Sequence, residues 1–520
     1  MKAARSNFQV GLILVLCALQ NPVFAQAPVW IWATAFKGDG PVQTLDIVSS
    51  SNNGCFVLGT FSNNLYLPFD TLVSLGGTGD YFVAHVDTLG AITWAAQFSD
   101  RVVSMHGLES DGVSCLVPYV ESTIVNGVQY MSTTVGRSAL LVTFDNMGSI
   151  TLLSNIVLTE WPVATDNVVE IRHAEGGGIV FADTFADSIL VAGSWVYGNG
   201  VYLARLSTEG TSLWAERIGC GSPIPGALHV DGEGRILIGL LDNCMVPEGP
   251  FYEEGSLISY TPAGEYEWHQ PYILNTFGDN STMARRQNGN ALTSVGFYTQ
   301  SGETVIQTKE FNGAGEAVWE NSLWGSASDN YPSGIYAYGD SATLLGGGVY
   351  QTPQFGPWTL PGGGGPNGFI ALLDGAGDWL WATAETSGSI FGNHVAPGTN
   401  SRIYTTGWSD GNAAFGDHQT STNFGNFIGF VACLGDVALH TTDTERKPEA
   451  LNAWPNPTTN ILHFSQRFAQ GQELHVFDAS GRTVLSRVLG SSTSSIDISD
   501  LVPGIYLLRI GERQARVVKQ

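Results

Sequence analysis

The sequence predicts an all-β protein: a seven-bladed β-propeller closed by its own N-terminal strand, followed by a small Ig-like β-sandwich. Three observations predict this fold. The 520 residues include 64 glycines, 14 tryptophans and 25 phenylalanines but only 13% charged residues, and such a composition favours short strands and tight turns over helices. One hairpin phrase recurs along most of the chain. Its last copy lacks a strand that the N-terminus can supply.

The first 25 residues have the pattern of a secretory signal peptide. Lys2 and Arg5 give a positively charged start, an apolar stretch runs from Val10 to Leu19, and Val23-Phe24-Ala25 offers a small-residue cleavage site before Gln26. This order of charged, apolar and small residues is typical of export signals. No later run reaches the roughly eighteen apolar residues that a membrane-spanning helix needs, so we expect no transmembrane segment.

The recurring phrase is an apolar strand, a polar turn that ends in Gly, and a strand that ends in Trp. Its clearest copy runs from Tyr81 to Trp94, with Asp87 three residues before Gly90. A short polar side chain at the first turn position and Gly at the last indicate a type I turn, so each phrase is predicted to be a β-hairpin. Further copies span 203–214, 258–268, 308–319 and 370–381, and a copy without the tryptophan spans 140–152.

A second pattern, a short strand joined to an apolar strand by a Gly/Asn/Asp turn, precedes each phrase. Two hairpins give four strands per repeat, and such repeats stack radially as blades because one small sheet cannot bury both faces alone. The last phrase, starting at Phe427, stops before its tryptophan strand, whereas Val29-Trp30-Ile31-Trp32-Ala33 is such a strand with nothing before it. We therefore expect the N-terminal strand to complete the seventh blade and leave no open edge.

The Phe-Val-Ala and Gly-to-Trp phrases resemble the SBBP class of seven-bladed β-propeller repeats found in bacterial exported proteins. After them, the polar segment 441–450 is predicted to be a linker. Apolar and polar residues alternate in 461–464, 474–477, 484–488 and 505–510, which predicts the strands of a small sandwich. The expected parts are a signal peptide (1–25), a β-propeller (26–440), a linker (441–450) and a C-terminal domain (451–520).

The C-terminal domain contains a set of short motifs in a fixed order. They are Pro455-Asn456-Pro457, Gly481-Arg482, Gly504-Ile505-Tyr506 and a basic end at Lys519. Together they resemble the type A C-terminal sorting domain of cargo of the Bacteroidetes type IX secretion system. The resemblance implies that the secretion machinery is a partner of this domain. It also implies that the protein crosses the periplasm and the outer membrane and is secreted or displayed at the cell surface.

Charge is distributed unevenly. Residues 26–440 contain 11 Lys and Arg against 39 Asp and Glu, a net charge of −28. Binding to phosphate depends on clustered Lys and Arg. We therefore expect no nucleic-acid partner for this acidic part of the chain. The cysteines show no zinc-binding spacing, and Cys220 and Cys244 are the plausible disulfide pair of an exported chain.

Four histidines fall near the starts of four repeats: His106, His173, His229 and His394. The first strand of a blade lies nearest the axis of a propeller, so these imidazoles could converge there and bind a transition metal or an acidic ligand. The alternative is that each packs against a neighbouring blade. No other cofactor is expected.

Two functions remain open on the sequence. The favoured one is a monomeric, non-catalytic binding or adhesion module for an unknown glycan or protein, with Trp195-Val196-Tyr197 and Phe355-Gly356-Pro357-Trp358 as possible sugar-stacking surfaces. The alternative is a secreted hydrolase or lyase that acts on polysaccharide. That alternative needs paired carboxylates, for which Asp231, Asp329 and Asp340 are candidates.

Overall fold

The computed structural model divides the chain into two compact units, Met1–Leu439 and His440–Gln520, termed here the body and the C-terminal domain. The structure describes residues 28–435 and 451–520 except for 52–53, 76–78, 109, 133–136, 160–169, 175–177, 186, 192, 219–223, 242–255, 272–280, 300–301, 326–329, 339–340, 351, 361–365, 386–388, 421–426, 452, 465–471, 478–482, 491–492 and 511–512. Cys220, Cys244, Asp329, Asp340, Gly481 and Arg482 therefore lie outside the described residues. Within the described part, no helix is long and apolar enough to cross a bilayer.

The described residues of the body form seven antiparallel sheets that share a four-strand meander. The first four meanders are β2 (Val42–Ser49), β3 (Cys55–Phe61), β6 (Asp80–Val86), β7 (Ile92–Phe98); β8 (Ser104–Gly107), β9 (Val113–Tyr119), β12 (Arg137–Phe144), β13 (Ile150–Thr159); β14 (Glu170–His173), β15 (Ile179–Phe185), β18 (Gly200–Leu206), β19 (Ser212–Arg217); and β20 (Ile224–Val230), β21 (Ile236–Leu241), β22 (Ser256–Tyr260), β23 (Tyr266–Pro271). The last three are β24 (Ser281–Arg285), β25 (Ala291–Tyr298), β26 (Thr304–Phe311), β27 (Ala317–Gly325); β28 (Tyr331–Tyr338), β29 (Ala342–Val349), β32 (Asn367–Asp374), β33 (Trp379–Ala384); and β34 (Ile390–Pro397), β35 (Ile403–Ser409), β38 (Ile428–Gly435), β1 (Val29–Gly38).

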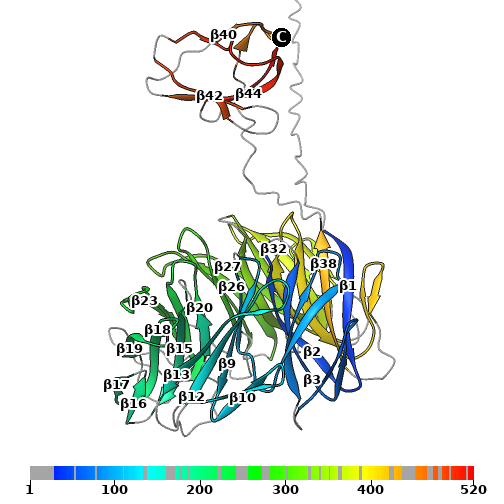
Figure 1. The fold of residues 1–520 in the computed structure, drawn as a ribbon, viewed down its shortest axis with the longest axis vertical. Helices are drawn as coiled ribbons and strands as arrows, with labels where there is room; N and C mark the ends of the chain where they lie inside the picture. The colour runs from blue at the N-terminus through cyan, green and yellow to red at the C-terminus, as the bar shows by residue number, and fades with distance from the viewer. Residues whose placement is uncertain are drawn as a thin grey trace, which may run out of the picture. The chain divides into compact units, whose positions relative to one another are not determined.

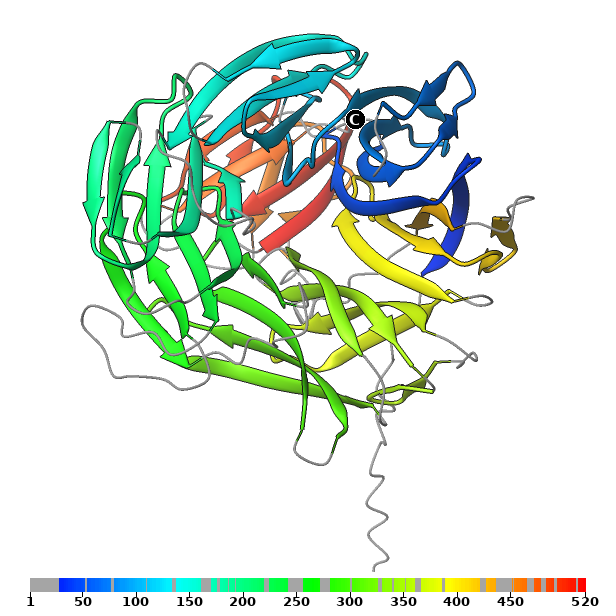
Figure 2. The same ribbon diagram turned by 90° about the horizontal axis from the view of Figure 1, so that it is seen from below.

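These sheets are arranged as propeller-like blades around a common centre (Figure 2). Their first strands contact one another in the cyclic order β2, β8, β14, β20, β24, β28, β34 and back to β2. The ring closes through β1, which runs beside β38 (Figure 1) and pairs with it antiparallel from Val29↔Gly435 to Phe36↔Gly429. The predicted pairing of the N-terminal strand with the last repeat is thus confirmed.

The recurring phrase forms the predicted turn. In the first blade, the Gly90 amide donates to the Asp87 carbonyl at 3.0 Å, and Asp87 Oδ1 accepts from the Leu89 and Ala91 amides at 2.8 and 2.9 Å. The same bond from the Gly amide to the carbonyl three residues earlier occurs at Gly148, Gly210, Gly264, Gly315 and Gly377. The short polar side chain therefore has the role in the turn that the sequence predicted.

The tryptophans of the phrase pack against the next blade. A Cβ added at Gly90 would lie 2.8 Å from the ring of Trp32, and one at Gly148 would lie 2.8 Å from the ring of Trp94. Both indole N–H groups donate to backbone carbonyls of those turns, at 3.0 Å. Gly264, Gly315 and Gly377 lie in the same way on Trp214, Trp268 and Trp319. Gly and Trp recur together because each joins one blade to its neighbour.

Short outer hairpins add strands that the sequence analysis did not anticipate. They are β4 (Asn64–Tyr66) with β5 (Thr71–Val73), β10 (Ser122–Val125) with β11 (Val128–Met131), β16 (Ser188–Val191) with β17 (Ser194–Tyr197), β30 (Gln354–Phe355) with β31 (Trp358–Thr359), and β36 (Ala413–Phe415) with β37 (His418–Thr420). Three of them pair with the outermost strand of the preceding blade: β4 with β1, β10 with β7 and β16 with β13. These strands of only two to four residues are too short to show the periodicity that identifies a strand.

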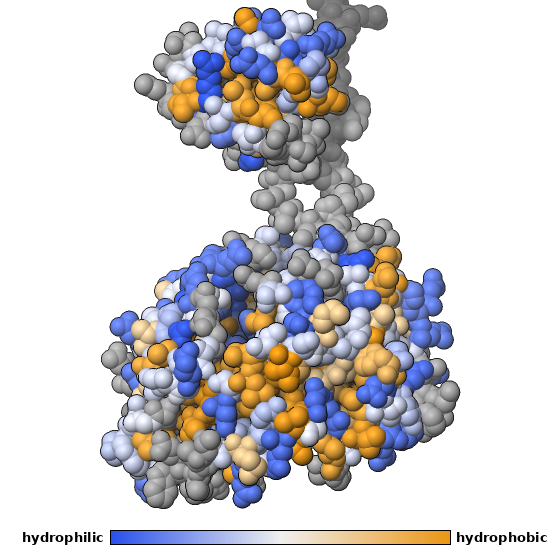
Figure 3. All heavy atoms as spheres, in the orientation of Figure 1, coloured by the Kyte–Doolittle hydropathy of each residue, from blue (hydrophilic) through white to orange (hydrophobic). Residues whose placement is uncertain are grey.

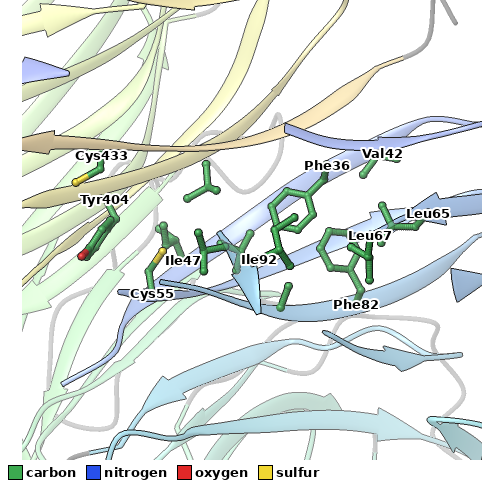
Figure 4. Close-up of a cluster of buried hydrophobic side chains, with 14 of the residues drawn as sticks. Phe36, Val42, Ile47, Cys55, Leu65, Leu67, Phe82, Ile92, Tyr404 and Cys433 are labelled. Atoms are coloured by element: carbon green, nitrogen blue, oxygen red, sulfur yellow. The ribbon is translucent and has the colours of Figure 1, made fainter. Parts of the chain in front are cut away.

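The core continues across the closure of the ring. Phe36 on β1 packs with Phe82 on β6 at a ring-centroid distance of 5.1 Å, and the same cluster includes Tyr404, Cys55 and Cys433 (Figure 4). Cys55, Cys115 and Cys433 are buried free thiols. Apolar residues from the first and the seventh blade therefore share one cluster, which reinforces the pairing of β1 with β38.

A buried ion pair within the fifth blade also bonds to the sixth. Arg286 Nε lies 3.0 Å from Glu310 Oε2, and the Arg286 guanidinium also donates to the Ala342 carbonyl and Thr343 Oγ1, both at 2.7 Å. Trp319 Nε1 donates to the same carboxylate at 2.7 Å. Both charges are satisfied, which is the condition under which buried ions are tolerated.

The C-terminal domain consists of two small sheets around one apolar core. The strands are β39 (Ala453–Trp454), β40 (Ile461–Phe464) and β43 (Ser495–Asp497) in one sheet, and β42 (Thr483–Val488), β41 (Glu473–Phe477), β44 (Gly504–Ile510) and β45 (Arg513–Lys519) in the other. Alternate residues of β44 point inward and outward: Tyr506 and Leu508 are buried, whereas Ile505 and Leu507 are exposed. Figure 3 shows apolar residues, in orange, on the surface of this domain.

We expect Gly148→Ala to lower the free energy of unfolding by about 2–4 kcal/mol, as measured by chemical denaturation. The alanine must adopt a φ of +82° and press against the Trp94 ring, which combines a left-handed backbone penalty with overpacking. Gly193→Ala is the control. Gly193 has a φ of +85° but no atom near its Cβ position, so only the backbone penalty of about 1–2 kcal/mol remains. Equal losses in the two variants would contradict the contact between blades.

Glu310→Gln should lower the free energy of unfolding by about 3–5 kcal/mol, because it leaves the buried Arg286 charge without its counter-ion. Glu320, which pairs with Lys309 at 3.2 Å and has an exposed side chain, provides the matched control. Glu320→Gln should cost at most about 1 kcal/mol. Denaturation of both variants under the same conditions checks this, and a small loss for Glu310→Gln would show that the buried pair does not hold the blades together.

Candidate functional site

The first strands of three successive blades present ionisable side chains from the same position. His106 on β8 pairs with Ser114, Arg172 on β14 with Val180 and His229 on β20 with Leu237. In each case the partner is the second residue of the neighbouring strand. Because equivalent positions in a ring of blades are related by rotation about its axis, these side chains share one level of the ring.

Asp46 and His394 meet where the ring closes. Each pairs with the fourth residue of the neighbouring strand, and each directly follows a β-bulge. His394 Nδ1 lies 3.7 Å from Asp46 Oδ1. Bulges re-aim side chains next to functional sites, and here two of them bring a carboxyl from the first blade and an imidazole from the seventh together.

Burial governs the pKa of both groups. Burial raises the pKa of Asp46 above its ordinary value, while the charges of His394 and Arg172 oppose that shift. The Asp46 side chain keeps 39% of its accessible surface, so it is surrounded by protein but still reachable. Burial also lowers the pKa of His394, with Asp46 opposing. The pair is therefore less strongly ionised than an exposed pair would be.

His173 occupies a different position from the other histidines. It pairs with Ile179, the first residue of β15, so it lies on the opposite face of β14 from Arg172. Its Nε2 and Nδ1 lie 3.0 and 3.3 Å from the hydroxyls of Ser114 and Ser104 in the preceding blade. Burial, followed by the charges of His106 and Arg172, lowers its pKa to about 3. This is the packing role that the sequence analysis gave as the alternative.

Arg172 is the permanent positive charge in this group. Its charge lowers the pKa of Asp46 in the first blade, of His173 in its own blade and of His229 in the fourth. The pKa of His229 falls to about 4, mainly through burial and then through Arg285, and burial lowers the pKa of His106. The imidazoles are therefore neutral at pH 7, and Arg172 is charged.

Tyr336 on β28 adds a hydroxyl from the sixth blade. Burial raises its pKa, and the Asp46 charge adds to that effect. Asp46, His106, Arg172, His229, Tyr336 and His394 are termed the axial cluster. The sequence analysis found three of these six. Asp46, Arg172 and Tyr336 were missed because the sequence signal was the recurrence of one residue type. Arg172 shares its strand position with His106 and His229, and Asp46 shares its position with His394, whereas Tyr336 pairs with Leu344, the third residue of β29.

The four histidines do not form one cluster. The rings of His106 and His173 stack with centroids 5.5 Å apart, and His394 lies beside Asp46. Among the residues that the structure describes, no three His, Cys, Asp or Glu side chains are grouped so that they could hold a metal ion. These histidines therefore lie in separate pairs, His106 with His173 and His394 with Asp46.

Asp231 has a structural role. Its Oδ1 accepts from the Glu233 and Arg235 amides at 2.9 and 2.8 Å, and its Oδ2 accepts from Arg235 Nε at 2.8 Å. It is the first residue of a turn, like Asp87 in the recurring phrase. Its oxygens are therefore already occupied.

Only one of the two predicted aromatic surfaces is exposed. Trp195 and Tyr197 on β17 are 48% and 68% exposed, with ring planes 20° apart and centroids separated by 6.0 Å. The second aromatic segment has a structural role. Phe355 is fully buried, because its ring packs edge-on against Trp379 at 4.9 Å between centroids, and Trp358 is only partly exposed.

In the C-terminal domain the motif at Gly504 and the basic end lie on the two strands of one hairpin. β44 and β45 pair from Gly504↔Lys519 to Ile510↔Arg513. Tyr506 Oη donates to the Val502 carbonyl at 2.7 Å, and Lys519 is buried. Asn456, between Pro455 and Pro457, accepts a hydrogen bond from the Val518 amide at 2.9 Å, so the first motif contacts the last strand.

Acid should destabilise the body partly through His229. Below the ordinary pKa of 6.5 the unfolded imidazole binds a proton that the folded one, with a pKa of about 4, does not, so stability falls as pH drops from about 6.5 towards 4. In His229→Gln, the loss of unfolding free energy between pH 7 and pH 5 should be smaller than in the parent by roughly 1–2 kcal/mol. Denaturation at both pH values checks this, and an unchanged loss would contradict the assignment.

Comparisons with known proteins give one family match and several distant structural likenesses. Residues 452–520 match the family described as the secretion system C-terminal sorting domain. No curated protein matches the chain. Among solved structures, the polysaccharide lyase Uly1 is 10% identical with a TM-score of 0.38, over 79% of this chain and 100% of that one.

Two further structures are similar to the same extent. The NanB sialidase of Streptococcus pneumoniae is 9% identical with a TM-score of 0.36, over 78% of this chain and 94% of that one. A member of the duf4221 family from Bacteroides vulgatus is 11% identical with a TM-score of 0.31, over 79% and 98%. At TM-scores below 0.5 these likenesses carry no inference about activity.

The family match and the motif order agree at the C-terminus. The described β-strands of residues 452–520 place the first and last motifs of the resemblance together, and the family model covers the same residues. Residues 452–520 are therefore a type IX secretion sorting domain, and the protein is exported across the outer membrane to the cell surface or beyond it.

Proposed function

We propose that the body is a closed seven-bladed β-propeller that binds an anionic ligand at the axial cluster without turning it over. The type A sorting domain, an Ig-like sandwich at 451–520, delivers it to the outside of the cell through the linker 441–450. The observation that carries this proposal is the position of Arg172. The guanidinium of Arg172 belongs to a group that contains neutral imidazoles, the Tyr336 hydroxyl and the Asp46 carboxyl, whose pKa burial raises.

The charges elsewhere in the body favour the surroundings of Arg172 as the place where an anion binds. Among the described residues of the body, Arg137, Arg235, Arg285, Arg286 and Lys309 form ion pairs with carboxylates. The surrounding net charge of −28 repels anions elsewhere on the surface. A cation in such a field gives a localised attraction, and charge-assisted bonds to carboxylate or sulfate are stronger than neutral ones.

The neutral side chains of the cluster suit polar recognition. The side chains of His106, His229 and Tyr336 are uncharged, and each offers a hydrogen-bond donor or acceptor. Trp195 and Tyr197 are exposed on the outer hairpin β16–β17 and form a separate surface on which a sugar ring can stack, which favours a glycan over a peptide. We therefore propose an acidic glycan, carrying carboxylate or sulfate groups, as the ligand class.

A catalytic alternative rests on a different observation. Asp46 has a raised pKa and lies 3.7 Å from His394, and perturbed groups that meet in this way are candidates for acid–base chemistry. A hydrolase or lyase acting on acidic polysaccharide would use such a pair. It differs from the binding proposal in releasing shorter products.

Arg172→Gln should weaken the binding of oligogalacturonate by about 10–100-fold, because it removes a charge-assisted contact of about 1.5–3 kcal/mol. Isothermal titration calorimetry with the full chain measures this, with neutral cellohexaose as the comparison ligand. Arg217→Gln is the control, since Arg217 lies on the outer strand β19. Equal affinities of parent and Arg172→Gln would exclude the axial cluster. Chromatography of the same mixtures would show shorter saccharides if the catalytic alternative holds.

A further inference from the structure

Three aromatic side chains of the seventh blade form a ladder across neighbouring strands. Phe391 on β34 pairs with Trp408 on β35, and their rings stack with centroids 4.2 Å apart and planes 16° apart. Phe427 immediately precedes β38, and its ring meets that of Trp408 edge-on at 4.7 Å between centroids. These three residues are termed the aromatic ladder.

The aromatic ladder is accessible, in contrast to the aromatic residues on the other face of the same blade. The side chain of Phe427 is 37% exposed, and the other two ladder side chains are partly exposed. Gly429 pairs with Trp408, so Phe430 lies on the opposite face of β38. There it packs against Phe415 at 4.9 Å between ring centroids, and both are fully buried. Aromatic surface of this blade is thus open to solvent at the ladder, where a ligand can reach it.

The register of β34 puts the ladder on the same face of the strand as a member of the axial cluster. Phe391 pairs with Trp408. After a β-bulge, His394 pairs with Thr406, which lies two residues before Trp408 on β35. Residues two rows apart in a sheet point to the same face, so Phe391 and His394 share one face of β34, about 7 Å apart along the strand. Without the bulge, their spacing of three residues would put them on opposite faces.

Hydrogen bonds from the sixth blade fix the bulge between these two side chains. The Gly392 amide donates to Tyr331 Oη at 3.3 Å, and the Gly392 carbonyl accepts from Ser333 Oγ at 2.6 Å. Gly392 has a φ of +89°, a conformation that glycine adopts without a steric penalty. The backbone therefore sets the placement of Phe391 relative to His394 before any ligand binds, and a preorganised site binds at a smaller entropic cost.

The aromatic ladder also adjoins the first blade, which carries Asp46. The Val42 amide donates to the Phe427 carbonyl at 3.0 Å. A Cβ added at Gly429 would lie 2.8 Å from Thr44 Cγ2. Val42 and Thr44 both lie on β2, the strand that bears Asp46. The ladder and the Asp46 carboxyl thus belong to the same junction between the seventh blade and the first.

We propose that the aromatic ladder is a sugar-stacking subsite for the acidic glycan of the axial cluster, and that the ligand is an oligosaccharide extending from the cluster onto the seventh blade. This inference rests on the proposed function. The apolar C–H faces of sugar rings stack on flat aromatic surfaces, and a few polar groups beside such surfaces fix the orientation of a ligand. The ladder therefore gives selectivity for an acidic saccharide chain over a simple anion.

Isothermal titration calorimetry of variants of the full chain with oligogalacturonate tests the subsite. Phe427→Leu keeps an apolar side chain but removes the exposed ring, and it should weaken binding about 5–10-fold, the loss expected for one stacking contact. Phe427→Tyr keeps the ring and should bind within about twofold of the parent. Trp324→Leu is the control and should bind like the parent, because Trp324 is 60% exposed on the outer strand β27 of another blade.

Salt separates the subsite from the contact made by Arg172. Ions screen the attraction between charges but not stacking. The loss in Phe427→Leu should therefore be the same at low and at high salt, whereas the loss in Arg172→Gln should shrink as salt rises. Parent-like affinity of Phe427→Leu, or equal losses in Phe427→Leu and Phe427→Tyr, would overturn the subsite and leave the axial cluster standing. Parent-like affinity of Arg172→Gln, or no binding by the parent, would instead refute the proposed function.

Discussion

The contact between the glycine of one turn and the tryptophan of the preceding blade is the constraint on which the body depends. A four-stranded sheet has two faces to bury, and it can bury them only against its neighbours. Because the turn glycine has no side chain, the indole ring of Trp32 or Trp94 packs directly under the backbone and donates to it. Where the tryptophan is missing, Gly210 packs on Ile156 instead. In this way the first six blades are each positioned by the one before it, and Trp32 of the N-terminal strand makes this contact between the seventh blade and the first.

Much of this architecture could be predicted from the sequence, for a physical reason. The turn chemistry of Asp87 and Gly90 and the terminal tryptophans repeat because every interface between blades imposes the same demand. The closing strand was predictable because 427–435 lacked a partner that 29–33 resembled. The outer hairpins were not predictable, because strands such as β16 have only four residues and are held by pairing with another blade. The sequence left open whether Phe355 is exposed or buried for a related reason: its burial depends on contact with Trp379 on another strand.

The axial cluster was only partly visible in the sequence. Histidine is a rare residue type, so its recurrence at four first strands stood out. Arg172, Asp46 and Tyr336 also lie on the first strands of their blades, but the residue type at these positions differs from blade to blade. Register decides on which face of the strand each of two adjacent residues lies. Arg172 and His173 are neighbours in sequence, yet they point to opposite faces of β14, and only the pairing with β15 assigns them. The β-bulges before Asp46 and His394 shift the register again, which no sequence period reveals.

The proposed function joins an acidic ring with one localised cation at its axis to a domain that exports it. NMR titration of the imidazole nitrogens of the full chain with oligogalacturonate tests this most directly. The account predicts that the signals of His106 and His229 shift together with one dissociation constant, that those of His463 and His475 in the C-terminal domain do not, and that the saccharide is recovered intact. Unshifted His106 and His229 signals, or release of shorter saccharides during the titration, would contradict it.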